Sequence, residues 1–284
     1  MSLQKLDHSL STLHGLHRGA LLIGAVQRLT QLPQPVYLEL GLDVQADGLA
    51  SGPLPEGGRL KLDLAKAELA YQSAGRGTTS FSLQNKSQAV LFDELFGALG
   101  AGELRGNLPP GESLFERVSQ GIAARGGRYR TPKREVLADE TPIQIDLQTA
   151  QDYQEALQAI FTGIARFQAH VTGLRTPLVV WPEHFDLSSL MFLGTEVDES
   201  KPHLNFGFAP FSDGIDYPYL YAYGYPYRED YRAPNLPAGT HWHTQGWTGA
   251  VLPYGEIARQ VDVVSFVETS CMAIYREVRP IVEY

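Results

Sequence analysis

A histidine and two carboxylates lie close together in Trp-Pro-Glu-His-Phe-Asp, residues 181–186. On an extended chain alternate side chains share a face, so His184 and Asp186 point to one side and Glu183 to the other. A carboxylate two residues from a histidine can orient the imidazole ring or bind a metal together with it. The alternative is a polar strand end whose side chains bond to nearby backbone groups. His184 and Asp186 are candidate catalytic residues, and Glu183 is a candidate ligand contact.

A second polar stretch contains two histidines, followed by a glutamine and a tryptophan, all on one parity: His241, His243, Gln245 and Trp247. On a strand these side chains project together, and histidines at i and i+2 can bind one metal ion. A metal centre needs a further ligand, and the 181–186 stretch offers imidazole and carboxylate, which suit zinc or iron. The candidate metal set is His184, Asp186 and His243. In the alternative, the polar side chains hydrogen-bond across the sheet and a tryptophan fills the core.

That arrangement requires residues 181–187 and 241–247 to form neighbouring strands, with His184 and His243 entering one cavity. We also expect Trp247 to lie beside His243, with its ring covered by the last helix. His243 is then a candidate catalytic residue, and the candidate ligand contacts in this stretch are His241, Gln245 and Trp247.

Tyrosines occupy every second position from 217 to 225, and smaller residues lie between them. As a strand, this segment has one face of phenols and one face small enough for a helix to pack closely. Phenols combine an apolar ring with a polar tip, which suits a wet cleft or a subunit contact. The alternative is an ordinary sheet surface covered by the following loop. Candidate ligand contacts are Tyr219, Tyr221 and Tyr223.

Hydrophobic periodicity indicates helices and strands in both halves of the chain. In the first half we expect a helix over 4–32, strands near 36–44, 60–64, 67–71 and 79–83, a helix after Ser87, and a short helix over 112–124. In the second half we expect a helix capped by Thr149, strands near 178–193, 203–209, 217–225 and 240–252, and one final helix over 257–278.

The order of these elements predicts an α+β fold in which antiparallel sheets pack against helices. Each half has the order helix, strands, helix, so an ancient duplication is a possible origin. We expect a first half of residues 1–148 and a second half of residues 149–284 that carries the candidate site. The two halves could also form one compact domain.

Composition limits the function classes. The chain has 284 residues and a formal net charge of −9, which argues against broad binding of nucleic acids or anionic membranes. Cys271 is the only cysteine, so an intramolecular disulfide or a cysteine metal cluster is excluded. It lies on the apolar stripe of the final helix, where we expect a buried, unreactive thiol. The N-terminal residues lack a signal-peptide pattern, and we expect a cytoplasmic protein.

Four segments together resemble an uncharacterised bacterial family, a conserved domain of unknown function: W-P-E-H-F-D-L (181–187), H-L-N-F-G-F (203–208), Y-L-Y-A-Y-G-Y-P (219–226) and W-H-T-Q-G-W-T-G-A-V-L-P-Y (242–254). The resemblance extends over most of the chain and is most specific in the second half. The family pattern often has glutamate where Gln245 stands and does not include His241. The resemblance therefore implies a site centred on His184, Asp186 and His243, without naming a reaction.

Three functions are consistent with these residues. The first is binding of a small polar or aromatic molecule in a cleft of the second half. The second is a metal-dependent hydrolase or oxygenase that uses His184, His243 and Asp186, with a divalent metal as cofactor. The third is an interaction protein whose tyrosine face forms a homodimer contact.

Overall fold

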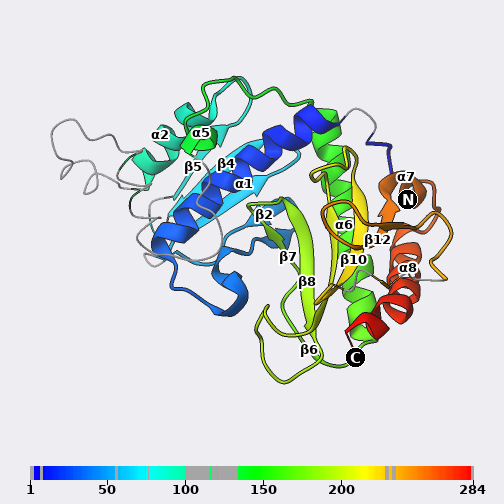
Figure 1. The fold of residues 1–284 in the computed structure, drawn as a ribbon. Helices are drawn as coiled ribbons and strands as arrows, with labels where there is room; N and C mark the ends of the chain where they lie inside the picture. The colour runs from blue at the N-terminus through cyan, green and yellow to red at the C-terminus, as the bar shows by residue number, and fades with distance from the viewer. Residues whose placement is uncertain are drawn as a thin grey trace. The chain divides into compact units, whose positions relative to one another are not determined.

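Two antiparallel sheets, each packed against helices, form from the two stretches of alternating sequence (Figure 1). The structure, a computed structural model, describes residues 3–6, 9–54, 57–73, 75, 77–99, 116, 120, 134–227, 230–231 and 235–282. Six helices and two sheets are present in these residues, which confirms the α+β class expected from the sequence. The chain divides into two compact units, residues 11–33 with 39–151, and residues 1–10 with 34–38 and 152–284. The duplication and the boundary at 148 and 149 stay predictions.

The unit made of residues 11–33 and 39–151 contains a five-stranded meander. Its strands are β1 (Asp43–Gln45), β2 (Gly48–Ala50), β3 (Arg59–Asp63), β4 (Glu68–Ser73) and β5 (Gly77–Ser82), and they pair in chain order. Its helices are α1 (Leu10–Thr30), α2 (Gln88–Ala98) and α5 (Arg134–Leu137). Gly19 lets α1 approach this sheet closely, because an added Cβ there would lie 2.9 Å from a methyl group of Leu62.

The other unit contains a seven-stranded sheet with the order β11-β12-β10-β9-β8-β6, and β7 also pairs with β8. The strands are β6 (Leu174–Arg175), β7 (Val179–Trp181), β8 (Asp186–Phe192), β9 (His203–Ala209), β10 (Tyr219–Tyr225), β11 (His241–His243) and β12 (Gly249–Pro253). Helices α6 (Leu147–Ala169), α7 (Tyr254–Ala258) and α8 (Val263–Val278) accompany them, and a 3-10 turn, η2 (Arg279–Ile281), follows α8.

Helices α6 and α8 cover one face of this sheet. The ring of Phe206, on β9, lies 4.8 Å from Phe167 of α6 and 6.3 Å from Tyr275 of α8. The small residues of β10 allow close packing on this side, as the sequence predicts: an added Cβ at Gly224 would lie 3.0 Å from Val282. The tyrosines of β10 alternate with these residues and therefore project from the opposite face.

Hydrogen bonds at the helix N-termini show where the expected helices begin. Ser87 caps α2, because its hydroxyl accepts a hydrogen bond from the Val90 amide at 3.2 Å. The cap of α6 is not Thr149 but Asp146, whose carboxylate accepts from the Thr149 amide at 2.8 Å, so α6 begins earlier than expected. The helix expected over 112–124 lies outside the described residues.

Two other expectations are wrong. Residues 36–44 do not form one strand: 3-10 turns cover Pro35–Leu40, with positive φ at Val36 and Tyr37, and only β1 follows. The final helix is broken in two, because Asp262 accepts a hydrogen bond from the Ser265 amide at 3.1 Å and starts α8 anew. Val261, expected on the apolar stripe, is 87% exposed at this break.

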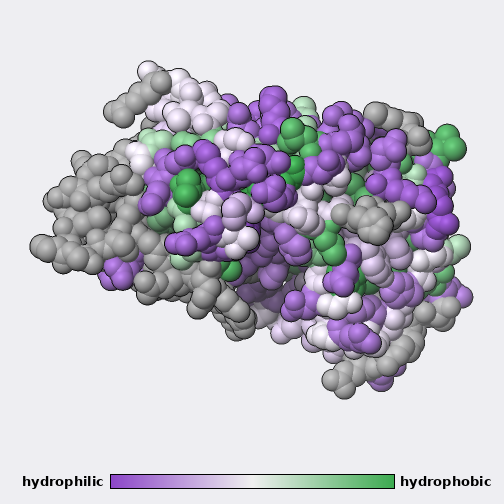
Figure 2. Space-filling model, turned by 90° about the horizontal axis from the view of Figure 1, so that it is seen from above, coloured by the Kyte–Doolittle hydropathy of each residue, from purple (hydrophilic) through white to green (hydrophobic). Residues whose placement is uncertain are grey.

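None of the helices within the described residues has the length and apolar character needed to cross a membrane. On the face drawn in Figure 2, hydrophobic residues lie as separate small patches among hydrophilic ones. Isolated apolar residues of this kind are normal for a protein surface and do not mark an interaction site.

Cys271 is completely buried in α8, and burial raises the pKa of its thiol. Both effects reduce the thiolate available to a labelling reagent. In the native protein we expect a disulfide reagent to label Cys271 on the order of 1,000-fold more slowly than in the unfolded chain, because labelling requires opening of the core. Labelling kinetics with and without guanidinium measure this ratio, and similar rates in the two conditions would contradict the packing of α8.

Candidate functional site

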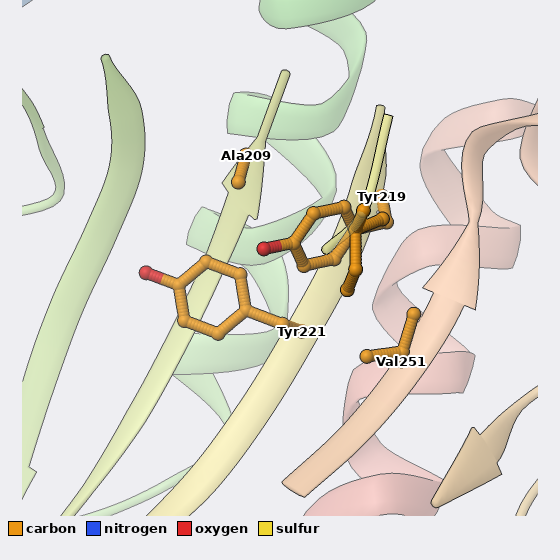
Figure 3. Packing of buried hydrophobic residues seen from close by; sticks show 5 residues of the cluster. Ala209, Tyr219, Tyr221 and Val251 are labelled. Atoms are coloured by element: carbon orange, nitrogen blue, oxygen red, sulfur yellow. The ribbon is translucent and has the colours of Figure 1, made fainter. Parts of the chain in front are cut away.

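The sheet face opposite α6 and α8 carries the candidate residues, and we call it the tyrosine face. The strand pairings place on it Asp186 and Ser188 of β8, His203, Asn205 and Gly207 of β9, Tyr219, Tyr221, Tyr223 and Tyr225 of β10, Gly249 and Val251 of β12, and His241 and His243 of β11. The rings of Tyr219, Tyr221 and Tyr223 follow one another at 6.0 and 6.1 Å. In Figure 3, the hydroxyl groups of Tyr219 and Tyr221 point away from Val251 of β12.

Gly207 allows the phenol of Tyr221 to cross β9 and reach β8. It pairs with Tyr221 on one side and Ser188 on the other. An added Cβ would lie 2.6 Å from the Tyr221 hydroxyl oxygen and 2.5 Å from the Leu187 carbonyl oxygen. Because glycine leaves this space open, the Tyr221 hydroxyl donates a hydrogen bond to Oδ2 of Asp186.

Asp186 is a buried carboxylate at the start of β8, 9% exposed. Its Oδ2 accepts from Tyr221, whereas its Oδ1 is buried and has no hydrogen-bond partner. Burial raises the pKa of this carboxyl. The nearby His184, the hydrogen bond from Tyr221, the backbone of Asp186 itself and the Ser188 hydroxyl all act in the opposite direction. The residue before it, Phe185, has a φ of 57°, which is strained for a bulky side chain. Strain at such a position is consistent with a functional site.

Further hydrogen bonds order the polar groups of the tyrosine face. The indole Nε1 of Trp181 donates to the Ser188 hydroxyl at 2.9 Å. The amide of Asn205 donates to the Tyr223 hydroxyl at 2.9 Å, but its Oδ1 is buried without a partner. This face therefore holds two oxygen acceptors, one on β8 and one on β9, that no described group satisfies.

Trp247 lies beside His243, as expected, but its ring packs on the tyrosine face and is not covered by the final helix, so that part of the expectation is wrong. Its ring lies 6.0 Å from Tyr221, 6.2 Å from Tyr223 and 4.7 Å from His243. Gly249 makes room for it, because an added Cβ would lie 2.7 Å from the Trp247 ring.

Each of the two buried histidines on this face, His203 and His243, hydrogen-bonds one ring nitrogen to a backbone carbonyl two residues away. His243 Nε2 lies 2.7 Å from the Gln245 carbonyl oxygen, and His203 Nδ1 lies 2.8 Å from that of Lys201. A carbonyl oxygen only accepts, so each of these nitrogens carries a proton. Burial lowers the pKa of His203, which favours its neutral form.

The structure separates the two polar stretches that we expected to be neighbours. Strands β12, β10 and β9 lie between β11, which carries His243, and β8, which carries Asp186. Both side chains are nevertheless on the same sheet face. His184 is exposed in the turn over residues 182–185, so it does not enter a cavity shared with His243. The expectation of adjacent strands is wrong.

The other candidates lie at the border of the tyrosine face. Glu183 is half-buried in the same turn as His184. His241 and Gln245 are exposed, and burial followed by the neighbouring His243 lowers the pKa of His241. Within the described part of the chain, no group of three or more His, Cys, Asp or Glu side chains is arranged to hold a metal ion. The set of His184, Asp186 and His243 therefore gains no support as a metal centre.

Three residues of the tyrosine face were missed by the sequence interpretation: Ser188, His203 and Asn205. The signal for two of them was present, since H-L-N-F-G-F places polar or small residues at every second position between large apolar ones. That alternation predicts a strand with one apolar and one polar face. Ser188 had no comparable signal in the sequence. Its hydrogen-bond partner, Trp181, comes close to it only because β7 pairs with β8.

Comparison with known proteins gives one match. Residues 129–278, more than half of the chain, match a family described as a family of unknown function, DUF5996. These residues include all four segments on which the resemblance was based. No curated protein and no solved structure matches the chain significantly. The chain belongs to the DUF5996 family.

Proposed function

We propose that the tyrosine face binds a small polar or aromatic molecule. The observation that carries this proposal is the pair of buried acceptors without partners, Asp186 Oδ1 and Asn205 Oδ1, among buried aromatic rings. Leaving a buried acceptor unsatisfied costs about 1–3 kcal/mol, so a donor on a bound molecule would be favoured at these two atoms. Aromatic rings with a few fixed polar groups are typical of small-molecule sites.

A subunit contact is a weaker explanation of the same tyrosines. Tyr219 and Tyr221 are only 3% and 6% exposed within a single chain, so they offer little area to a second copy. Tyr217 and Tyr225, at the ends of the row, are exposed. A homodimer contact would therefore use the ends of the row and leave the central polar groups unexplained.

The three tryptophans give a direct test. Trp181 and Trp247 border the polar groups of the tyrosine face, whereas Trp242 contacts Tyr231, which bonds to the backbone of α8. We expect small aromatic alcohols, acids or amines to shift the indole N–H signals of Trp181 and Trp247 in nuclear magnetic resonance spectra and to leave that of Trp242 unchanged. Equal shifts at all three indoles, or none with any of these compounds, would refute the proposal.

Matched phenol variants test the role of the polar groups. Tyr223→Phe removes the hydroxyl that accepts from Asn205, and we expect it to weaken binding of the same compounds by about fivefold to tenfold, the loss of one hydrogen bond. Tyr217→Phe is the control, because Tyr217 is exposed at the end of the row. Affinities from the indole shifts make the comparison. Equal losses in the two variants would contradict a site at Tyr223.

A further inference from the structure

Asp186 lacks the positive partner that a buried carboxylate normally has. It is the only buried Asp or Glu among the described residues, and no described lysine or arginine forms an ion pair with it. The one positive charge that acts on it is that of His184, which is exposed. A buried charge without compensation is costly, and the usual remedies are an ion pair or several hydrogen bonds.

The groups around Asp186 favour an organic cation as the missing partner. Tyr219 and Tyr221, on the same face, lie within electrostatic reach of the carboxylate. Faces of aromatic rings attract cations. A metal ion prefers several charged or imidazole ligands, and Asp186 belongs to no group of three or more His, Cys, Asp or Glu in the described residues.

We propose that the molecule bound at the tyrosine face is a small organic ammonium ion, whose N–H group donates a hydrogen bond to Oδ1 of Asp186. This inference rests on the proposed function and names the class of its ligand. The Tyr221 hydroxyl already occupies Oδ2, so Oδ1 is the free acceptor. The formal net charge of −9 also favours the approach of cations over anions.

An ammonium group is favoured over a neutral donor because of charge. A neutral hydroxyl could satisfy Oδ1 but would leave the buried negative charge uncompensated. A charge-assisted hydrogen bond is about twice as strong as a neutral one. It also favours ionised Asp186, so ammonium binding and deprotonation of the carboxyl support each other.

Two probes of nearly equal shape separate charge from shape. We expect 2-phenylethylamine, as its ammonium ion, to bind about tenfold or more tightly than 2-phenylethanol, measured from the Trp181 and Trp247 indole shifts. Asp186→Asn should remove this preference, because the carboxamide is neutral. Asn205→Leu is the matched variant on the neighbouring strand and should keep the preference while weakening both probes.

The pH dependence of the affinity for 2-phenylethylamine gives a second measurement, which needs no variant of Asp186. Burial raises the pKa of Asp186, so lowering the pH protonates it before it would protonate an ordinary carboxyl, while the amine remains charged. Amine affinity should therefore fall as the pH is lowered, and alcohol affinity should not. The same fall should persist in His184→Gln, which removes the one basic side chain that acts on the carboxylate. Tyr153, Tyr219 and Tyr221 have raised pKa values and stay neutral.

The outcomes distinguish this inference from the proposed function. Equal binding of amine and alcohol would overturn the ammonium inference and leave a neutral ligand at the same face. No indole shift with either probe would overturn both. If Asp186→Asn does not fold, the preference of the wild-type protein for the amine and its pH slope in His184→Gln decide the matter.

Discussion

Gly207→Ala is expected to destabilise the protein by about 3 kcal/mol, the upper part of the usual range for overpacking. The new Cβ would lie 2.5 Å from the Leu187 carbonyl oxygen and 2.6 Å from the Tyr221 hydroxyl oxygen. The carbonyl belongs to a paired strand and cannot move freely, so the phenol must leave its place over β9. The hydrogen bond from Tyr221 to Asp186 should break as a result.

Gly255→Ala is the matched control for this prediction. An added Cβ at Gly255, in α7, meets no atom within 4 Å, and alanine is about 1 kcal/mol better than glycine inside a helix. We therefore expect it to be neutral or slightly stabilising in denaturant melts. The double variant Gly207→Ala/Tyr221→Leu should be less destabilised than the sum of its single changes. Full additivity would show that the Tyr221 ring does not compete for the space over Gly207.

The sequence predicts the faces of the strands more reliably than their order. The period of two in residues 217–225 correctly places the tyrosines of β10 on one side and the small residues on the other. Periodicity reports only which residues share a face and carries no information about which strands pair. Strand order depends on contacts between distant segments, so the separation of β8 from β11 by three strands could not be derived from local pattern.

The same limit applies to the candidate site, because its contacts depend on strand register. The choice of Asp186 came from its residue type and its neighbour His184, yet the structure gives it Tyr221 as its direct partner. That contact depends on a register in which Gly207 lies opposite Tyr221, and the sequence does not specify register. Helix ends were misjudged for a different reason. Asp146 is three residues before Thr149, whose T-x-x-D pattern is an equally good capping signal, and Asp262 lies within an apolar stripe that continues past it.

Trp247→Ala is expected to lower the free energy of unfolding by about 3 kcal/mol. This value is near the lower end for loss of a packed tryptophan, because the Trp247 ring is half-buried. The ring covers Tyr219, Tyr221 and Tyr223, so its removal exposes the centre of the row. His243→Ala removes one hydrogen bond, from Nε2 to the Gln245 carbonyl oxygen, together with a ring contact. One hydrogen bond contributes on the order of 1 kcal/mol, so His243→Ala should destabilise less.

Thermal and denaturant melts of Trp247→Ala and His243→Ala, each with and without 2-phenylethylamine, compare the two contributions. Only one imidazole nitrogen of His243 is engaged by its own loop, and the ring projects from the tyrosine face, so its loss should reduce binding of the probe more than it reduces stability. Trp247→Phe, which keeps an aromatic ring over the tyrosines, should recover about half of the stability lost in Trp247→Ala, as ring area is partly restored. A larger loss of stability in His243→Ala than in Trp247→Ala would identify the histidine as the structural centre of this face. The hydrogen bond within its own loop, and not a ligand, would then account for its burial.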